Sequence, residues 1–175
     1  YSRTGTSSTR TTHPHYMELF QDLLNSLGLE ITLYNPYQFK TKGEMVTECK
    51  NKDFLAGNII NTMSCSHPDV GRMRGESETQ HCGTCLPCII RRAAINSAGI
   101  DDRTSYYDED FSSGKTARKN LNSYLLGLEK FDSERAYLDI QMSGPLNSNL
   151  EQYESIFKRG IAELKEVLKD YHENT

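Results

Sequence analysis

The chain has 175 residues, of which 25% are charged and 36% hydrophobic, and its formal net charge is -4. This composition suits one globular domain, or a smaller domain with an appendage, and the acidic balance argues against wholesale nucleic-acid binding. No apolar run approaches the ~20 residues that a membrane span needs, so we expect no membrane segment, and we expect no signal peptide.

Residues 1–12 contain eight Ser or Thr, two arginines and no acidic residue. Such a composition fits a disordered terminus and fits equally a loop over an anionic ligand, with Arg3 and Arg10 as the charged contacts. The chain opens on Tyr1, inside this run, and we expect it to be the C-terminal part of a longer protein.

The next residues predict a helix followed by a strand. Thr12 is a suitable N-cap, Pro14 suits the first turn, and apolar residues at i, i+3 and i+4 up to Leu27 predict one buried face before Gly28 ends the helix. His13 is a candidate ligand contact, with a solvated histidine at the helix start as the alternative. Residues 29–33 alternate apolar and polar side chains, which predicts a strand and hence half of an α/β unit.

A capping box predicts a helix from Thr41 to about Cys49, because the Thr41 hydroxyl and the Glu44 carboxylate can exchange bonds with unpaired amides. A rival interpretation makes Lys40 or Lys42 a phosphate ligand at this helix start. Asp53 is the expected cap of a short helix that follows.

Four of the five cysteines lie between residues 65 and 88: Cys65, Cys82, Cys85 and Cys88. Each Cys-x-x-Cys step lets two sulfurs converge on one tetrahedral ion about 2.3 Å away. We favour a structural four-cysteine Zn²⁺ site over disulfides, because disulfides would leave Cys49 unpaired and because clustering at metal spacing indicates a reducing cytoplasm. Gly83 suits the tight turn, and Pro87 suits the first turn of the helix that follows.

Several charged or imidazole side chains surround this cluster. Four thiolates around Zn²⁺ leave two net negative charges, which nearby arginines could offset: Arg72, Arg74, Arg91 and Arg92. His67 and His81 flank the cysteines, but four cysteines already complete a site, so we expect neither histidine to be a ligand.

The rest of the chain is predicted to be helical after an acidic, aromatic loop over residues 101–113. One helix runs to about Ala98 and ends at Gly99, and later helices cover residues 116–131, 132–142 and 149–171. The last has apolar residues at heptad-like spacing, which favours packing against neighbouring helices and leaves a surface for protein partners.

The segment from His81 to Tyr106 resembles the end of QueC-type 7-cyano-7-deazaguanine synthases. The residues that carry the resemblance are Ser64-Cys65, Cys82-Gly83-x-Cys85-x-x-Cys88, Arg91, and Ala98-Gly99 with Asp102-x-Thr104-x-Tyr106. The helix that starts at Lys40-Thr-Lys-Gly-Glu-Met is similar to one in the family, and the resemblance covers residues ~10–107.

The resemblance implies a Rossmann-like adenine-nucleotide α-hydrolase (PP-loop) fold, which is α/β. Here it would be the C-terminal part, mostly helical, with a zinc knuckle in residues 1–107 and a helical extension in residues 108–175. It also implies an enzyme that uses ATP and Mg²⁺ to adenylate a deazapurine carboxylate and convert it through the amide to the nitrile. The candidate substrate contacts are Arg3, Arg10, His13, Lys42, Arg72 and Arg91.

Three departures from the family separate this chain from standard members. The Ser-Gly-Gly-x-Asp-Ser phosphate loop is not among these 175 residues, so ATP and Mg²⁺ are expected only with an N-terminal part. The Arg- and Thr-rich start replaces a Pro-Asp-Cys-Arg-like segment, and the helical extension is extra. The last two features resemble the QatC branch of anti-phage defence proteins, so the alternative is a non-catalytic zinc-binding assembly subunit.

Overall fold

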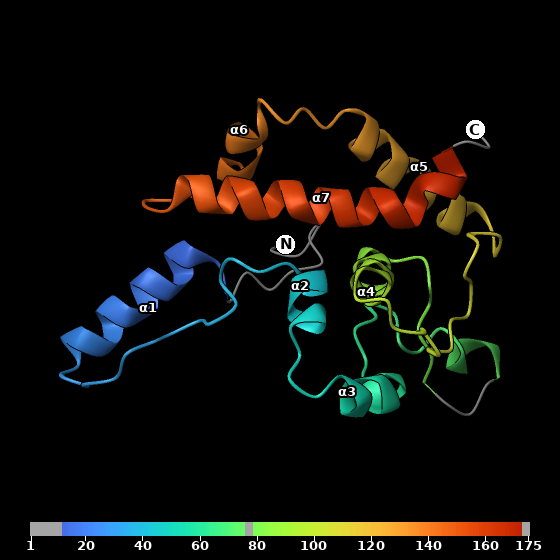
Figure 1. Cartoon of the computed structure of the whole chain (residues 1–175), viewed down its shortest axis with the longest axis horizontal. Coiled ribbons are helices and arrows are strands. Elements are labelled where there is room, and N and C mark those ends of the chain that lie inside the picture. The colour runs from blue at the N-terminus through green and yellow to red at the C-terminus, as the bar shows by residue number, and fades with distance from the viewer. Residues whose placement is uncertain (1–11, 76–78, 173–175) are drawn as a thin grey trace. The chain divides into compact units, whose positions relative to one another are not determined.

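The computed structural model describes residues 12–75 and 79–172, and these residues are mostly helical (Figure 1). Two short 3₁₀ turns, η1 (Ile59–Asn61) and η2 (Arg72–Arg74), accompany seven α-helices: α1 (Pro14–Ser26), α2 (Lys42–Thr47), α3 (Lys52–Asn58), α4 (Leu86–Ser97), α5 (Lys115–Glu129), α6 (Ala136–Gln141) and α7 (Leu150–His172). None of the described helices is long and apolar enough to cross a membrane.

The described chain divides into two compact units. The first contains residues 12–39 and 132–158, and the second contains residues 40–131 and 159–172. Helix α7 therefore contributes its first part to one unit and its second part to the other. The expected boundary between a family domain and an extension, at residues 107 and 108, stays a prediction.

In the first unit, helix α1 forms where it was predicted, with Gly28 just beyond its end at a φ of 69°. The predicted N-cap, Thr12, is wrong, because the ring of His13 caps the helix and its Nδ1 accepts from the His15 amide at 3.3 Å. The expected buried face is also wrong: Leu24 is 9% exposed, but Leu19 is 55% and Leu27 64% exposed. Helical periodicity identified an apolar face, but it did not show what would cover that face.

The predicted strand at residues 29–33 is not formed. A strand needs a neighbouring strand, and the described residues contain no β-ladder, only an isolated bridge between His81 and Tyr106. The Gln21 side chain takes the place of such a neighbour: its Nε2 donates to Ile31 O and its Oε1 accepts from Leu33 N, both at 2.8 Å. The α/β expectation is therefore not reproduced by this chain's own described residues.

The core of the second unit lies between α4, α5 and the second part of α7. Its buried members are Ile89, Phe111, Ala117, Leu125, Leu128 and Leu168. Tyr124 packs against the cluster, and its hydroxyl donates to Thr84 O at 3.1 Å. Burial raises the pKa of that hydroxyl to about 12, so it stays protonated and holds α5 to the turn before α4.

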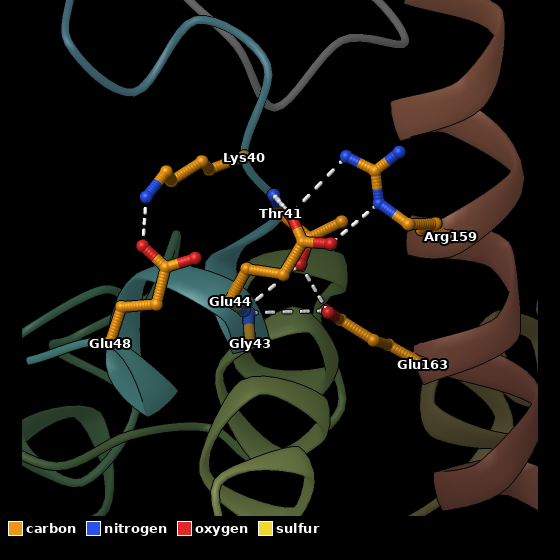
Figure 2. A network of polar contacts seen from close by, with 7 residues as sticks. All are labelled: Lys40, Thr41, Gly43, Glu44, Glu48, Arg159 and Glu163. Atoms are coloured by element: carbon orange, nitrogen blue, oxygen red, sulfur yellow. Dashed lines mark hydrogen bonds and ion pairs between the residues drawn. The ribbon is translucent and has the colours of Figure 1, made fainter.

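Helix α2 packs beside α4 in the same unit and begins with the predicted capping box (Figures 1 and 2). Glu44 N donates to Thr41 Oγ1 at 3.0 Å, and Thr41 N donates to Glu44 Oε2 at 2.9 Å. Two side chains from α7 complete the network: Arg159 Nε donates to Glu44 Oε1 at 2.5 Å, and Glu163 accepts from the Thr41 hydroxyl and the Gly43 amide. These contacts tie α7 to the start of α2.

Two further predictions about where helices begin are wrong. Helix α3 is capped by Asn51, whose Oδ1 accepts from Phe54 N at 3.0 Å, and Asp53 lies inside its first turn. Helix α6 begins at Ala136 instead of directly after Asp132, because the Asp132 carboxylate accepts from Glu134 N at 2.9 Å and forms a separate turn. At the start of α3, both Asn51 and Asp53 are residue types that can cap a helix, and the sequence did not decide between them.

Candidate metal centre

Four cysteines from two separate segments meet in the second unit. Cys65 lies in the chain after η1, Cys82 and Cys85 lie in the turn that leads into α4, and Cys88 lies in the first turn of α4. Their four sulfurs all lie within 4.8 Å of one another. The last three cysteines are buried, and Cys65 is half-buried.

The sulfur positions fit a tetrahedral ion. Sulfurs held 2.3 Å from a shared Zn²⁺ in a tetrahedron are separated by about 3.8 Å. The Sγ–Sγ distances are 3.9 Å for Cys65–Cys85, 4.0 Å for Cys82–Cys88 and 3.4 Å for Cys85–Cys88. The cluster could therefore hold one metal ion with four sulfur ligands and no ligand position left open.

Backbone amides point at the sulfurs, as thiolates require. The amides of His67 and Cys82 each donate to Cys65 Sγ at 3.2 Å, and the amide of Cys85 donates to Cys82 Sγ at 3.3 Å. Hydrogen bonding from Cys65 lowers the pKa of the Cys82 thiol and lowers that of Cys85 to about 5. Hydrogen bonds within the same cluster raise the pKa of the Cys65 and Cys88 thiols, so the argument for a cation rests on the spacing of the four sulfurs.

The turn between Cys82 and Cys85 depends on Gly83. Its φ is 83°, which lies in the left-handed region, and a Cβ at this position would overlap the carbonyl of Asp108. Pro87 occupies the first turn of α4. Both features match the sequence prediction for a turn that leads into a helix.

The two histidines that flank the cysteines differ in environment. His67 is exposed, whereas His81 is 3% exposed. One ring nitrogen of His81, Nε2, lies 3.1 Å from the Thr62 carbonyl, so it carries the hydrogen and donates. The other, Nδ1, lies 3.8 Å from Cys88 Sγ. His81 therefore packs between the segment before Cys65 and the cluster.

Arg91 joins three parts of the second unit beside the cluster. Its guanidinium donates to Thr62 Oγ1 at 2.8 Å, to Ile59 O at 2.5 Å and to Thr104 Oγ1 at 3.0 Å. Asp102 in turn accepts from Thr104 N at 3.0 Å and from the Tyr106 hydroxyl at 2.8 Å. Arg91 therefore holds α4 to η1 and to the segment after α4.

Arg92 and Arg72 also lie near the cluster, whereas the side chain of Arg74 lies outside the described part of the structure. Arg92 donates to Glu109 O at 2.9 Å and lies over the Tyr106 ring at 5.9 Å from its centroid. Arg72 is exposed and contacts Asp69 at 3.4 Å.

The other candidate substrate contacts are Arg3, Arg10, Lys42 and His13. Arg3 and Arg10 lie outside the described residues. Lys42 is exposed on the first turn of α2, whose amide at Gly43 is taken by Glu163. His13 belongs to the other compact unit, where its Nε2 lies 3.4 Å from Ser143 Oγ.

Sequence reasoning missed the contacts of Arg159 and Glu163. They lie 115 and 122 residues from their partners Glu44 and Thr41. No local sequence signal marks such pairs. The sequence shows only that Arg159 and Glu163 are four residues apart and therefore lie on one side of the last amphipathic helix.

Comparison with known proteins gives relatives for the same region. The 7-cyano-7-deazaguanine synthases of Brucella ovis, Brucella melitensis and Brucella suis are each 32% identical to the chain over 111 residues. That alignment covers 61% of this chain and 42% of each relative, so the chain spans less than half the length of these curated relatives. No solved structure matches the chain.

The family comparison covers the cysteine cluster and the helices before it. The match extends over residues 9–99, more than half of the chain, and includes all four clustered cysteines and Arg91. The matched family implies a Rossmann-like PP-loop fold. The described residues of this chain contribute helices and no β-strand to such a fold. The chain therefore belongs to the QueC family, described as queuosine biosynthesis protein QueC.

Proposed function

We propose that the four cysteines bind one structural Zn²⁺ ion. The support is a closed set of four sulfurs at tetrahedral spacing, with amide donors to them and no ligand position left for a substrate. Tetrahedral sulfur sites also suit iron–sulfur chemistry, so the identity of the metal needs a measurement. Elemental analysis of purified protein should give about one zinc per chain and no iron. Iron with sulfide, or a well-folded protein without metal, would refute this assignment.

We further propose that the chain is the zinc-containing C-terminal part of a QueC-like ATP-dependent enzyme. The supporting observation is the family match over residues 9–99, together with the printed name of the Brucella relatives. The reaction proposed is adenylation of a deazapurine carboxylate, followed by amidation and nitrile formation. ATP and Mg²⁺ would be bound outside these 175 residues, and the metal would keep Arg91 and the segment 102–106 in place.

The test is an activity assay on the protein that contains this chain. With ATP, ammonia and 7-carboxy-7-deazaguanine, AMP should be released and the nitrile should form. An absence of AMP with every deazapurine tested, from a protein with its metal bound, would reject the synthase proposal.

Arg72 offers a matched test of the substrate contacts proposed on this chain. The Arg72 side chain is 58% exposed beside the metal loop, so it is free to contact a substrate. Arg72→Gln should raise KM for the deazapurine, because it removes the guanidinium proposed to make that contact. Arg103→Gln is the control, since Arg103 is similarly exposed, at 66%, and likewise stands near one aspartate. Equal effects of the two substitutions would remove Arg72 from the substrate site.

A second proposal is a non-catalytic zinc-binding subunit of an anti-phage defence complex. It is favoured by the helices α5, α6 and α7, all of which lie beyond the region matched to the family. This alternative predicts a zinc-loaded protein that releases no AMP yet is required for protection in a phage plating assay. Four reduced cysteines suit the cytoplasm, which is the location we propose in either case.

A further inference from the structure

Two side chains from one face of α5 hold the carbonyl of Thr84, in the turn between Cys82 and Cys85. The Tyr124 hydroxyl donates to Thr84 O at 3.1 Å, and Asn120 Nδ2 donates to the same oxygen at 3.3 Å. Asn120 and Tyr124 are one helical turn apart, so both lie on the same side of α5. A carbonyl oxygen can accept two hydrogen bonds, and α5 supplies both donors.

The same peptide group faces the cysteine cluster with its other end. Thr84 O and Cys85 N belong to one planar peptide unit, which does not rotate about its C–N bond. Cys85 N donates to Cys82 Sγ at 3.3 Å. Fixing the oxygen of this peptide therefore fixes the direction of its N–H, which points at the sulfur of a proposed metal ligand. Donation to the oxygen also polarises the peptide and strengthens the hydrogen bond that its N–H makes.

The position of this peptide matters because its neighbours leave room for movement. Gly83 precedes Thr84, and a glycine backbone can adopt many conformations when nothing restrains it. Cys82, Thr84 and Asn120 also line a common cavity of about 520 Å³. The cavity gives a competing ligand a path toward the Cys82 side of the cluster. A turn that moved away from α5 would therefore leave the metal more open to removal.

Tyr124 is a suitable residue for holding this peptide. Its ring packs against the core formed by α4, α5 and α7, so the hydroxyl is presented to Thr84 from a fixed base. Burial, with the charges of the Cys85 and Cys82 sulfurs as smaller causes, raises the pKa of Tyr124 to about 12. The hydroxyl therefore keeps its proton and remains a donor at neutral pH.

We propose that Tyr124 and Asn120 are positioning residues for the metal centre. They orient the Thr84–Cys85 peptide so that its N–H stabilises the Cys82 sulfur, and they thereby slow the release of the metal. Both residues lie beyond the region 9–99 that matches the QueC family, so α5 contributes to metal retention from outside that region. This inference rests on the structural metal site proposed above.

The test compares the rates at which the reduced, metal-loaded proteins release metal to an excess of a chromogenic chelator at neutral pH. Tyr124→Phe should release metal about tenfold faster than the wild type, because the outer partners of metal ligands typically change metal affinity by this factor or more. The matched control is Tyr171→Phe. Tyr171 packs against the same core, but its hydroxyl donates to Glu109 O at 3.0 Å, so its loss should change the rate by less than about twofold.

Urea unfolding of the loaded proteins separates positioning from general loosening of the core. Tyr124→Phe and Tyr171→Phe each remove one hydroxyl that donates to a backbone carbonyl, so they should lose similar unfolding free energy. A difference in release rate between them then reflects the contact with the metal turn, and not the stability of the whole unit.

Asn120→Ala provides a second test that leaves the core side chain of Tyr124 in place. It should also speed metal release, and Asn122→Ala is its control, because Asn122 is exposed two positions further along α5 and faces another side of the helix. If Tyr124→Phe does not fold, this second pair decides the question by the same comparison.

Equal release rates for Tyr124→Phe and Tyr171→Phe would overturn the inference, and so would equal rates for the two asparagine variants where that pair decides. Elemental analysis of the wild type distinguishes this failure from failure of the metal site. Wild-type protein without metal rejects the site and this inference together, whereas a metal-loaded wild type with equal rates rejects the positioning role alone.

Discussion

Gly83→Ala should destabilise the protein more than the same substitution at a glycine where an added Cβ would contact no other atom. Gly83 has a φ of 83°, and adopting this left-handed conformation costs a residue with a Cβ roughly 1–2 kcal/mol. The new methyl would also overlap the Asp108 carbonyl, which is backbone and cannot rotate away. Relieving such overlap typically costs about 1–3 kcal/mol. The expected total is therefore about 2–5 kcal/mol.

Gly99→Ala is the matched control for this experiment. Gly99 also has a left-handed backbone, with a φ of 65°, but a Cβ there meets nothing within 4 Å. It should lose only the conformational part, about 1–2 kcal/mol. Both substitutions change the unfolded chain in the same way, so that effect cancels in the comparison.

The assay is urea unfolding followed by far-UV circular dichroism on the metal-loaded proteins, with metal content measured in parallel. Gly83→Ala should unfold at lower urea than Gly99→Ala, and it should retain less metal, because the turn it disturbs carries Cys82 and Cys85. Equal unfolding free energies for the two variants would refute the reasoning, since the close approach to Asp108 would then contribute nothing.

Three further predictions follow from the cluster and the α2 network. Cys88→Ser should abolish stoichiometric metal binding, whereas Cys49→Ser should leave it unchanged, as measured by elemental analysis, because Cys49 lies outside the cluster. A chelator should remove the metal more readily at pH 5 than at pH 7.5, because protons compete for the thiolates; a rate independent of pH, followed by absorbance of a metal indicator, would contradict thiolate ligation. The pair Arg159→Ala and Glu44→Gln should show a coupling energy of about 0.5 kcal/mol in a double-mutant cycle, since both side chains are partly exposed, at 40% and 32%. The hydrogen bond from Arg159 lowers the pKa of Glu44 from 4.5, so this coupling should be fully present at pH 7 and lost as the pH falls through the lowered pKa. A coupling that persists once Glu44 is fully protonated would refute the assignment.

Features specified by neighbouring residues were predictable from the sequence. The capping box of Thr41 and Glu44 needs residues three apart, and the left-handed Gly28 and Gly99 follow directly after their helices. The cysteine spacing was also sufficient to predict a cluster, because the last three ligands lie on one turn and one helix start. In each case the interacting residues are only a few positions apart, so the sequence alone is enough to predict the interaction.

Features that depend on distant partners were not predictable. The alternation at residues 29–33 indicates a strand only if another strand lies beside it, and here a glutamine side chain stands in that position. The apolar face of α1 indicates burial only if another element covers it, yet Leu27 is 64% exposed. Gly43 is a tight contact because Glu163 and the Ser97 side chain approach it, and the surrounding sequence contains no sign of either.

The Gln21 side chain has a consequence for how residues 29–33 meet other proteins. A carboxamide has the same donor and acceptor as a peptide group, so Gln21 satisfies Ile31 O and Leu33 N as one unit of an adjacent strand would. A polypeptide that attempted to pair with this exposed apolar segment would first have to displace two internal hydrogen bonds of 2.8 Å. Gln21 thereby disfavours aggregation through the backbone of residues 29–33. A partner strand that forms more than two backbone hydrogen bonds with this segment could still displace the Gln21 side chain.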